Sequence, residues 1–224
     1  MDDLKQIIDK IIKSNRKTCS LEINKQGRLV IRVPNYYSEA DINHILHQKQ
    51  DWIIKHHKIK QDKIASSQEL KEGRTLYLGE FIDIEYIPLN NLLLKYENKK
   101  IYININNKSE YKEILYNWYR INAKKYLINQ VNYYANKYDF TINNIRIKDQ
   151  KRRWGSCSNK KNINLNWRLI MANNKIIEYI IIHELAHTVE LNHSVRFWNI
   201  VKKILPDYKE TENQIKSLEY LLDL

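Results

Sequence analysis

Two histidines four positions apart, with a glutamate directly after the first, lie in the apolar segment 180–193 as His183-Glu184-Leu185-Ala186-His187. On a helix, residues four apart stand one above the other on the same face, so two imidazoles there can bind one metal ion. Glu184 directly follows His183 on the helix, so it would lie close to the metal. It is not needed as a ligand and can accept or donate a proton. Two ligands and one unbound carboxylate are typical of zinc hydrolases.

A third histidine, His193, follows His187 by six residues. A catalytic zinc ion takes three protein ligands and keeps a fourth position for water, so we expect His193 to complete the set. The spacing equals that of the metzincin pattern, except that Glu190 replaces the glycine that lets the chain turn back. A residue other than glycine costs free energy in a left-handed turn. We therefore expect the helix to end without the glycine turn of that pattern, for instance at Asn192.

These histidines have an alternative interpretation, because a lone histidine on a helix is usually a surface or core residue. Here, however, three histidines have the spacing of metal ligands, a glutamate directly follows the first of them, and an apolar run precedes them. This combination favours a metal site. A thiolate from Cys157 as fourth ligand would close the site and make it structural. We expect Cys157 to be a packed loop residue instead.

The developing oxyanion of a hydrolysis reaction needs a hydrogen-bond donor besides the metal. Several side chains of a suitable type lie in the sequence around the motif, and the sequence does not choose among them. The candidates for contact with the substrate or the oxyanion are Arg153, Arg168, Asn192 and Tyr208, with Arg152 beside the first.

The chain of 224 residues carries 38 Lys and Arg against 26 Asp and Glu, a net charge of +12. Such a charge indicates a nucleic-acid partner or lysine spread over the whole surface by an AT-rich genome, and we favour the second. The two cysteines make no disulfide framework. Neither a secretory leader nor an apolar run of membrane-spanning length is evident. We expect a soluble, reduced, cytoplasmic protein without a membrane partner.

The first half of the chain predicts a mostly β unit with an inserted helix, residues 1–107. Apolar spacing predicts a short helix over 4–12, and two alternating runs around Gly27 predict a hairpin. Ser38 is the expected cap of a helix that reaches Lys55, and the polar segment 62–74 is expected to be a loop. Breaks at Gly79 and at 88–91 and 97–100 then separate four short strands, 75–78, 80–87, 92–96 and 101–105.

The second half, residues 108–224, predicts an α+β domain built around the histidine helix. Its first element is a long amphipathic helix over 108–138, and alternation predicts strands over 145–148 and 162–168. The strand 162–168 is our candidate for a sheet edge on which a peptide substrate adds as a further strand. The histidine helix begins near Asn174, and two more helices are expected over 194–205 and 209–222.

Several segments together resemble the YgjP-like metallopeptidase family, whose relatives include the SprT-like zincins. They are Lys151-Arg152-Arg153-Trp154-Gly155-Ser156-Cys157-Ser158, the segment 162–169, the 183–187 motif, Asn192-His193-Ser194 with Phe197-Trp198, and Pro206-Asp207-Tyr208. Tyr77-Leu78-Gly79 and Arg32-Val33-Pro34 also fit. The resemblance implies a zincin-like domain with zinc on His183, His187 and His193 and with Glu184 as catalytic base.

The resemblance does not fix the substrate, because a nucleotide-hydrolysing activity has also been attached to the family. We expect a zinc metallopeptidase with a peptide or protein substrate and one Zn²⁺ per chain. The alternatives are a zinc hydrolase of a non-peptide substrate, such as a nucleoside triphosphate, and a DNA-associated SprT-like protease or module. No phosphate-binding GxxxxGK[ST] loop supports the nucleotide alternative.

Overall fold

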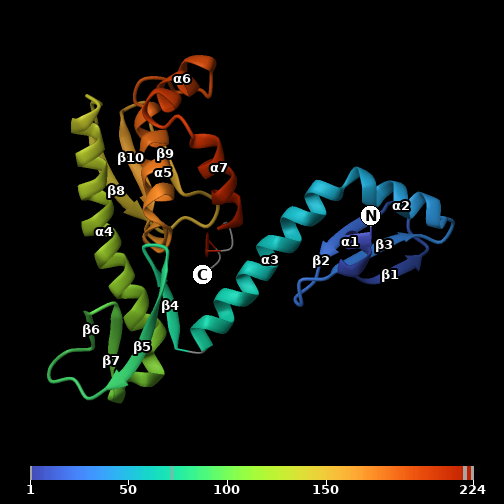
Figure 1. Ribbon diagram of the computed structural model, residues 1–224, viewed down its shortest axis with the longest axis horizontal. Helices are drawn as coiled ribbons and strands as arrows, with labels where there is room; N and C mark the ends of the chain where they lie inside the picture. The colour runs from blue at the N-terminus through green and yellow to red at the C-terminus, as the bar shows by residue number, and fades with distance from the viewer. Residues whose placement is uncertain (1, 72, 219–220, 223–224) are drawn as a thin grey trace. The chain divides into compact units, whose positions relative to one another are not determined.

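The computed structural model of the protein describes residues 2–71, 73–218 and 221–222. Its contacts divide the chain into two compact units, one formed mainly by Met1–Gln68 and the other mainly by Glu69–Lys216. Helices and strands occur in both (Figure 1), which confirms the predicted α+β class. Among the described helices, none has the length and apolar character needed to cross a membrane.

The first unit is a three-stranded sheet packed against helices. β3 (Leu29–Pro34) is the central strand, with β1 (Ile8–Ser14) parallel to it and β2 (Ser20–Ile23) antiparallel. The predicted hairpin is confirmed, and Gly27 takes the left-handed conformation in its turn (φ 79°). The core joins one face of β3 to α1 (Asp2–Ile7), α2 (Glu39–Gln48) and α3 (Gln50–Lys71), through Leu4, Leu29, Ile31, Val33, Ile42, Leu46 and Ile53.

Two predictions in this unit were wrong. The helix expected over 4–12 ends at Ile7, because the next residues form β1 and their backbone pairs with β3. Most of the loop expected over 62–74 is helical instead, because α3 continues to Lys71. That segment is rich in good helix formers and contains no proline or glycine before Gly73. The Ser38 cap is confirmed, because the Ser38 side chain accepts a hydrogen bond from Asp41 N and the Asp41 side chain accepts one from Ser38 N. The single helix predicted after Ser38 is divided at Lys49 into α2 and α3.

The second unit begins with a four-stranded sheet in the order β4-β5-β7-β6. Its strands match the four predicted ones: β4 (Arg74–Tyr77), β5 (Glu80–Ile87), β6 (Leu94–Glu97) and β7 (Lys100–Asn104). A short 3-10 helix, η1 (Ile105–Glu110), leads into the predicted long helix α4 (Tyr111–Lys137). α4 contacts the next sheet and α5, so it spans this unit (Figure 1).

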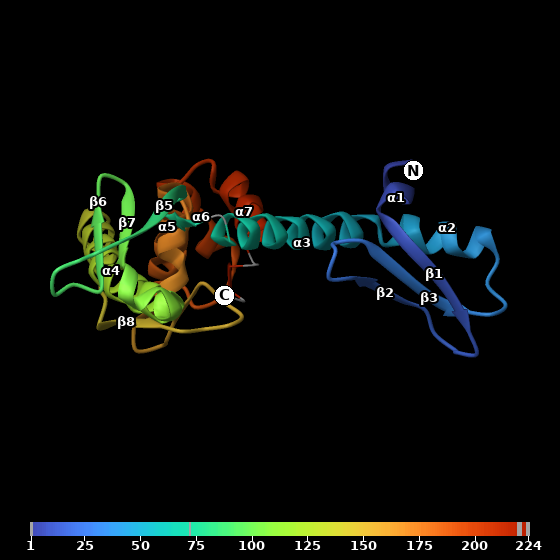
Figure 2. The ribbon, with the colours of Figure 1, turned by 90° about the horizontal axis from the view of Figure 1, so that it is seen from below.

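The remaining elements surround the histidine helix. A second sheet has the order β8-β10-β9, formed by β8 (Asn144–Lys148), β9 (Gly155–Cys157) and β10 (Asn162–Asn166). After η2 (Trp167–Met171) come α5 (Asn174–Ala186), α6 (Val195–Ile204) and α7 (Tyr208–Ser217). Figure 2 shows the same elements from below.

The expectation that segment 162–168 forms a sheet edge was wrong. β10 is the central strand, with β8 parallel on one side and β9 antiparallel on the other. Its Ile163 and Leu165 are fully buried, as a strand with neighbours on both sides requires. The strand that lies beside α5 is β9, and among the described residues it pairs with β10 alone.

The contacts divide the chain at Gln68, not at the predicted boundary between 107 and 108. The reason is that the β4–β5 turn docks on the segment just before α5. Leu78 N donates to Ile170 O at 2.8 Å, and Gly79 N donates to Met171 O at 3.0 Å. Since this turn supports the start of the histidine helix, the first sheet belongs with the second unit.

Gly79→Ala should destabilise the protein more than Gly73→Ala. Both glycines have a left-handed backbone, φ 82° and 78°, where any other residue costs about 1–2 kcal/mol. A Cβ on Gly79 would also lie 2.6 Å from Asn173 Cβ and 2.8 Å from its Cα, whereas one on Gly73 meets nothing closer than 3.4 Å. Thermal unfolding, monitored by circular dichroism, measures the melting temperatures of the two variants. Each kcal/mol of lost stability should lower the melting temperature by about 2–4 °C. Equal shifts for the two variants would contradict this role of Gly79.

Candidate metal centre

The position of α5 is fixed at both ends. At its start, the Asn173 side chain accepts a hydrogen bond from Ile176 N at 3.0 Å, as an N-cap does. The apolar residues that follow are buried, including Ile181 and Ile182 at 0% exposure. The helix ends at Ala186, and none of residues 187–193 has a positive φ. The chain therefore leaves the helix before Asn192, and no left-handed turn makes a glycine necessary at Glu190.

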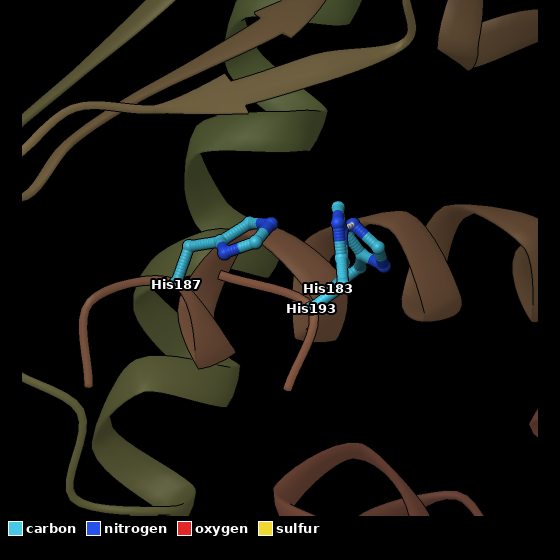
Figure 3. A group of neighbouring side chains, drawn as sticks. All are labelled: His183, His187 and His193. Carbon is cyan, nitrogen blue, oxygen red and sulfur yellow. Dashed lines mark hydrogen bonds between the residues drawn. The ribbon is translucent and has the colours of Figure 1, made fainter. Parts of the chain in front are cut away.

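The three histidines of the motif face one another (Figure 3). Their ring centroids are 4.7–5.0 Å apart in each of the three pairs. One nitrogen from each of His183, His187 and His193 lies within 4.8 Å of the others. The Nε2 atoms of His183 and His193 are 3.0 Å apart, near the ~3.3 Å expected between two nitrogens on one tetrahedral zinc ion. The geometry fits one shared cation.

The protonation of these rings also fits a metal site. His187 Nδ1 lies 3.0 Å from Glu190 O, and because a carbonyl only accepts, Nδ1 carries the proton. The Nε2 atom of His187 keeps its lone pair, as a ligand needs. Burial, and then the neighbouring His187 and His193, lower the pKa of His183 to about 3. His183 is therefore neutral at physiological pH, which is the form that binds metals.

Glu184 is buried beside the histidines, with 6% exposure. It packs against Gly155, the first residue of β9, where an added Cβ would lie 2.6 Å from Glu184 Oε1. Burial raises the pKa of Glu184 to about 8, and the charge of Arg153 acts in the opposite direction. A cation held by the three histidines would lower that pKa further. The carboxyl group thus lies against the edge strand β9, on the residue next to His183.

His193 lies on the loop after α5 and is held by aromatic stacking. Its ring stacks on Trp198, with centroids 5.6 Å apart and planes at 24°. Trp198 stacks in turn on Tyr208 at 5.1 Å, and Ser194 caps α6 by accepting from Phe197 N at 3.3 Å. The site therefore depends on α6 and on the first residue of α7 as well as on α5.

The other predicted site residues are not brought together. Arg153 is exposed and close enough to act on Glu184. Arg168 is buried and paired with Asp149. Asn192 is exposed on the loop before His193, and Tyr208 belongs to the aromatic stack.

Cys157 lies outside the histidine group, as far as the described residues show. Its Sγ is 3.5 Å from Ser158 O, and the thiol is partly buried. Burial and the charge of Glu184 raise the pKa of Cys157 to about 11. Cys157 is therefore a half-buried residue of the strand β9, and its thiol is protonated at neutral pH in the absence of a metal ion.

Sequence reasoning missed the contribution of two glycines to the site. Gly155 gives room to Glu184, and Gly79 gives room to the cap residue Asn173. The signal was their rarity, since the chain has only 4 glycines. In a chain that avoids glycine, a glycine can mark a place where another part of the chain approaches the backbone closely.

Comparisons with known proteins found a family model and solved structures that the chain resembles. The family model described as YgjP-like, metallopeptidase domain, matches residues 17–218. No curated protein sequence matches the chain significantly. Among solved structures, the metallopeptidase zymogen abylysin of Pyrococcus abyssi is 27% identical, with a TM-score of 0.37, over 40% of this chain and 90% of its own. The metallopeptidase zymogen jannalysin of Methanocaldococcus jannaschii is 28% identical, with a TM-score of 0.35, over 40% of this chain and 92% of its own.

Proposed function

The chain belongs to the YgjP-like metallopeptidase family, and from that premise we propose that it is a zinc peptidase whose ion is held by His183, His187 and His193. The observation that supports zinc is the donor set. Three imidazoles converge from one helix and the loop after it, and three histidines leave one tetrahedral position for water. Membership in a metallopeptidase family makes the reaction a metal-dependent peptide hydrolysis.

Glu184 is the proposed general base. A bound zinc ion would supply a water of lowered pKa and would polarise the peptide carbonyl. Glu184 lies one residue from a ligand and is buried against Gly155, so it can accept the proton of the attacking water and pass it to the leaving nitrogen. Arg153, whose charge acts on Glu184, is the proposed partner of the oxyanion. Asn192 and Tyr208 remain candidates, whereas Arg168 is engaged with Asp149.

The substrate is proposed to add as a strand to β9. This strand contacts α5, and in the part of the chain that the structure describes it pairs with β10 alone. An extended peptide can therefore hydrogen-bond to its free edge, next to Glu184. This edge favours a peptide over a nucleotide.

The test is hydrolysis of casein by the purified protein, with and without a chelator. We expect activity that the chelator abolishes and that one equivalent of zinc restores. A nucleoside triphosphate serves as the second substrate in the same assay. Chelator-sensitive hydrolysis of the triphosphate without cleavage of casein would reject the peptidase proposal in favour of the non-peptide alternative.

Gly155→Ala should remove most of the activity while leaving the metal in place. The new methyl group would displace the Glu184 carboxyl group, which lies 2.6 Å from the Cβ position and is buried, so it has little room to move. A displacement of ~1 Å can cost about 100-fold in rate. Turnover and zinc content are measured together.

The control for this variant is Ser156→Ala. Ser156 lies next along β9, and its hydroxyl accepts from Asn164 Nδ2 at 3.2 Å on the opposite face of the sheet. We expect this variant to keep both zinc and turnover. Full activity of Gly155→Ala would show that Glu184 is not confined there.

A further inference from the structure

Three consecutive cations, Lys151, Arg152 and Arg153, lie on the loop between β8 and β9, which we name the basic loop. All three are exposed. Within the described part of the chain, neither Lys151 nor Arg152 has an ion-pair partner, and the charge of Arg153 acts on Glu184. Nothing in the fold itself uses the charges of Lys151 and Arg152.

The backbone of the basic loop is held in place by a buried asparagine. Asn166, with 0% exposure, donates through Nδ2 to Gln150 O and to Arg153 O, the second at 3.1 Å, and its own N donates to Trp154 O at 2.8 Å. Buried amides seldom remain without such partners. One side chain in the core therefore fixes both ends of a loop whose three outward side chains are charged.

The residue before this segment is anchored as well. Asp149 pairs with the buried guanidinium of Arg168 and accepts from Tyr116 OH at 2.9 Å. The carboxylate that precedes the three cations is thus directed to the body of the protein. The loop presents net positive charge.

The basic loop leads directly into the strand that borders the candidate centre. Gly155, two residues after Arg153, is in contact with Glu184. An extended chain advances about 3.3 Å per residue, so a peptide paired with β9 and continuing past Gly155 would pass the basic loop within a few residues of the reacting carbonyl.

We propose that the basic loop is a substrate subsite that selects acidic residues, Asp or Glu, on one side of the cleaved peptide bond. This inference rests on the proposed function. A duplex nucleic acid fits less well, because non-specific binding engages several phosphates along a surface, whereas this loop presents three cations at one strand end. Guanidinium and ammonium groups that a held backbone presents next to an extended chain suit single carboxylates.

The size of the effect follows from the exposure of the cations. Exposed ion pairs are weak and salt-sensitive, so two of them should favour an acidic substrate by about 3- to 10-fold in kcat/KM. The difference should lie in KM, because the loop holds the substrate and takes no part in proton transfer. It should shrink as salt is raised.

The experiment uses the full-length, zinc-loaded protein and a random peptide library, with cleavage sites found by mass spectrometry. A cleaved sequence is then remade in two forms, with Glu or Gln at the positions facing the loop. The wild type should prefer the Glu form. The variant Lys151→Gln/Arg152→Gln should lose the preference for the Glu form. Lys124→Gln/Lys125→Gln, which removes two exposed charges from α4, should keep it.

Equal rates for the Glu and Gln forms in the wild type would overturn the proposal. So would an unchanged preference in Lys151→Gln/Arg152→Gln. Salt-dependent binding of a DNA duplex that this variant loses, without any acidic preference in cleavage, would assign the loop to nucleic acid instead. A wild type that binds zinc and cleaves the library without preference refutes the subsite alone, whereas one that does neither refutes the proposed function and the subsite with it.

Discussion

Glu184→Gln should bind zinc, fold and be almost inert. Glutamine keeps the size of the side chain and its hydrogen-bonding reach beside Gly155, but it cannot accept a proton from water. Losing a general base typically lowers the rate about 10²- to 10⁴-fold. Zinc affinity should change little, because the three imidazoles that form the ligand set are intact. The measurements are turnover of casein and zinc content of the same preparation.

Two results would contradict this account of Glu184. Wild-type turnover would mean that another residue, or the metal alone, activates the water. Loss of zinc would mean that Glu184 is a ligand. In that case the site would not be the open three-histidine site.

His183→Ala and His187→Ala should each abolish zinc binding, and His193→Ala should weaken it sharply. Changing a residue that only supports a ligand typically costs 10- to 100-fold in metal affinity, so loss of a ligand should exceed about 100-fold. His193 comes from the loop rather than from α5, so two ligands remain in place when it is removed. Competition with a chelator of known affinity measures the zinc affinity of each variant.

The control for the histidine series is His44→Ala. His44 is an exposed residue of α2, where its Nε2 lies 2.8 Å from Gln48 Nε2. Its removal should leave zinc affinity unchanged. Full zinc occupancy in His193→Ala would place the third ligand elsewhere, with Glu190 as the next candidate.

The local part of the site was predictable from the sequence. The ligand pattern on α5 depends on helical periodicity, and the Asn173 cap lies at its start. Both are properties of neighbouring residues. The convergence of His193 with the other two rings was also expected from spacing. The stacking of its ring on Trp198, and of Trp198 on Tyr208, was not, because the stack joins the loop after α5 to α6 and α7.

Two of the errors concern contacts between distant segments. Ile8 to Ile12 have a spacing that suits a helix, but pairing with β3 makes this segment a strand. Asn and Ile alternate along β10 as on an edge strand with one polar face, yet β10 is central because β8 and β9 flank it. Single-sequence periodicity reports which faces are polar and not which strands are neighbours. The same limit hid the contact of Gly155 with Glu184.

X-ray absorption spectroscopy at the zinc edge tests the central claim most directly. On the purified zinc-loaded protein, we predict three imidazole nitrogens at about 2.0–2.1 Å and one further light-atom ligand from water. Four imidazoles, or a sulfur at about 2.3 Å from Cys157, would contradict an open catalytic site formed by His183, His187 and His193.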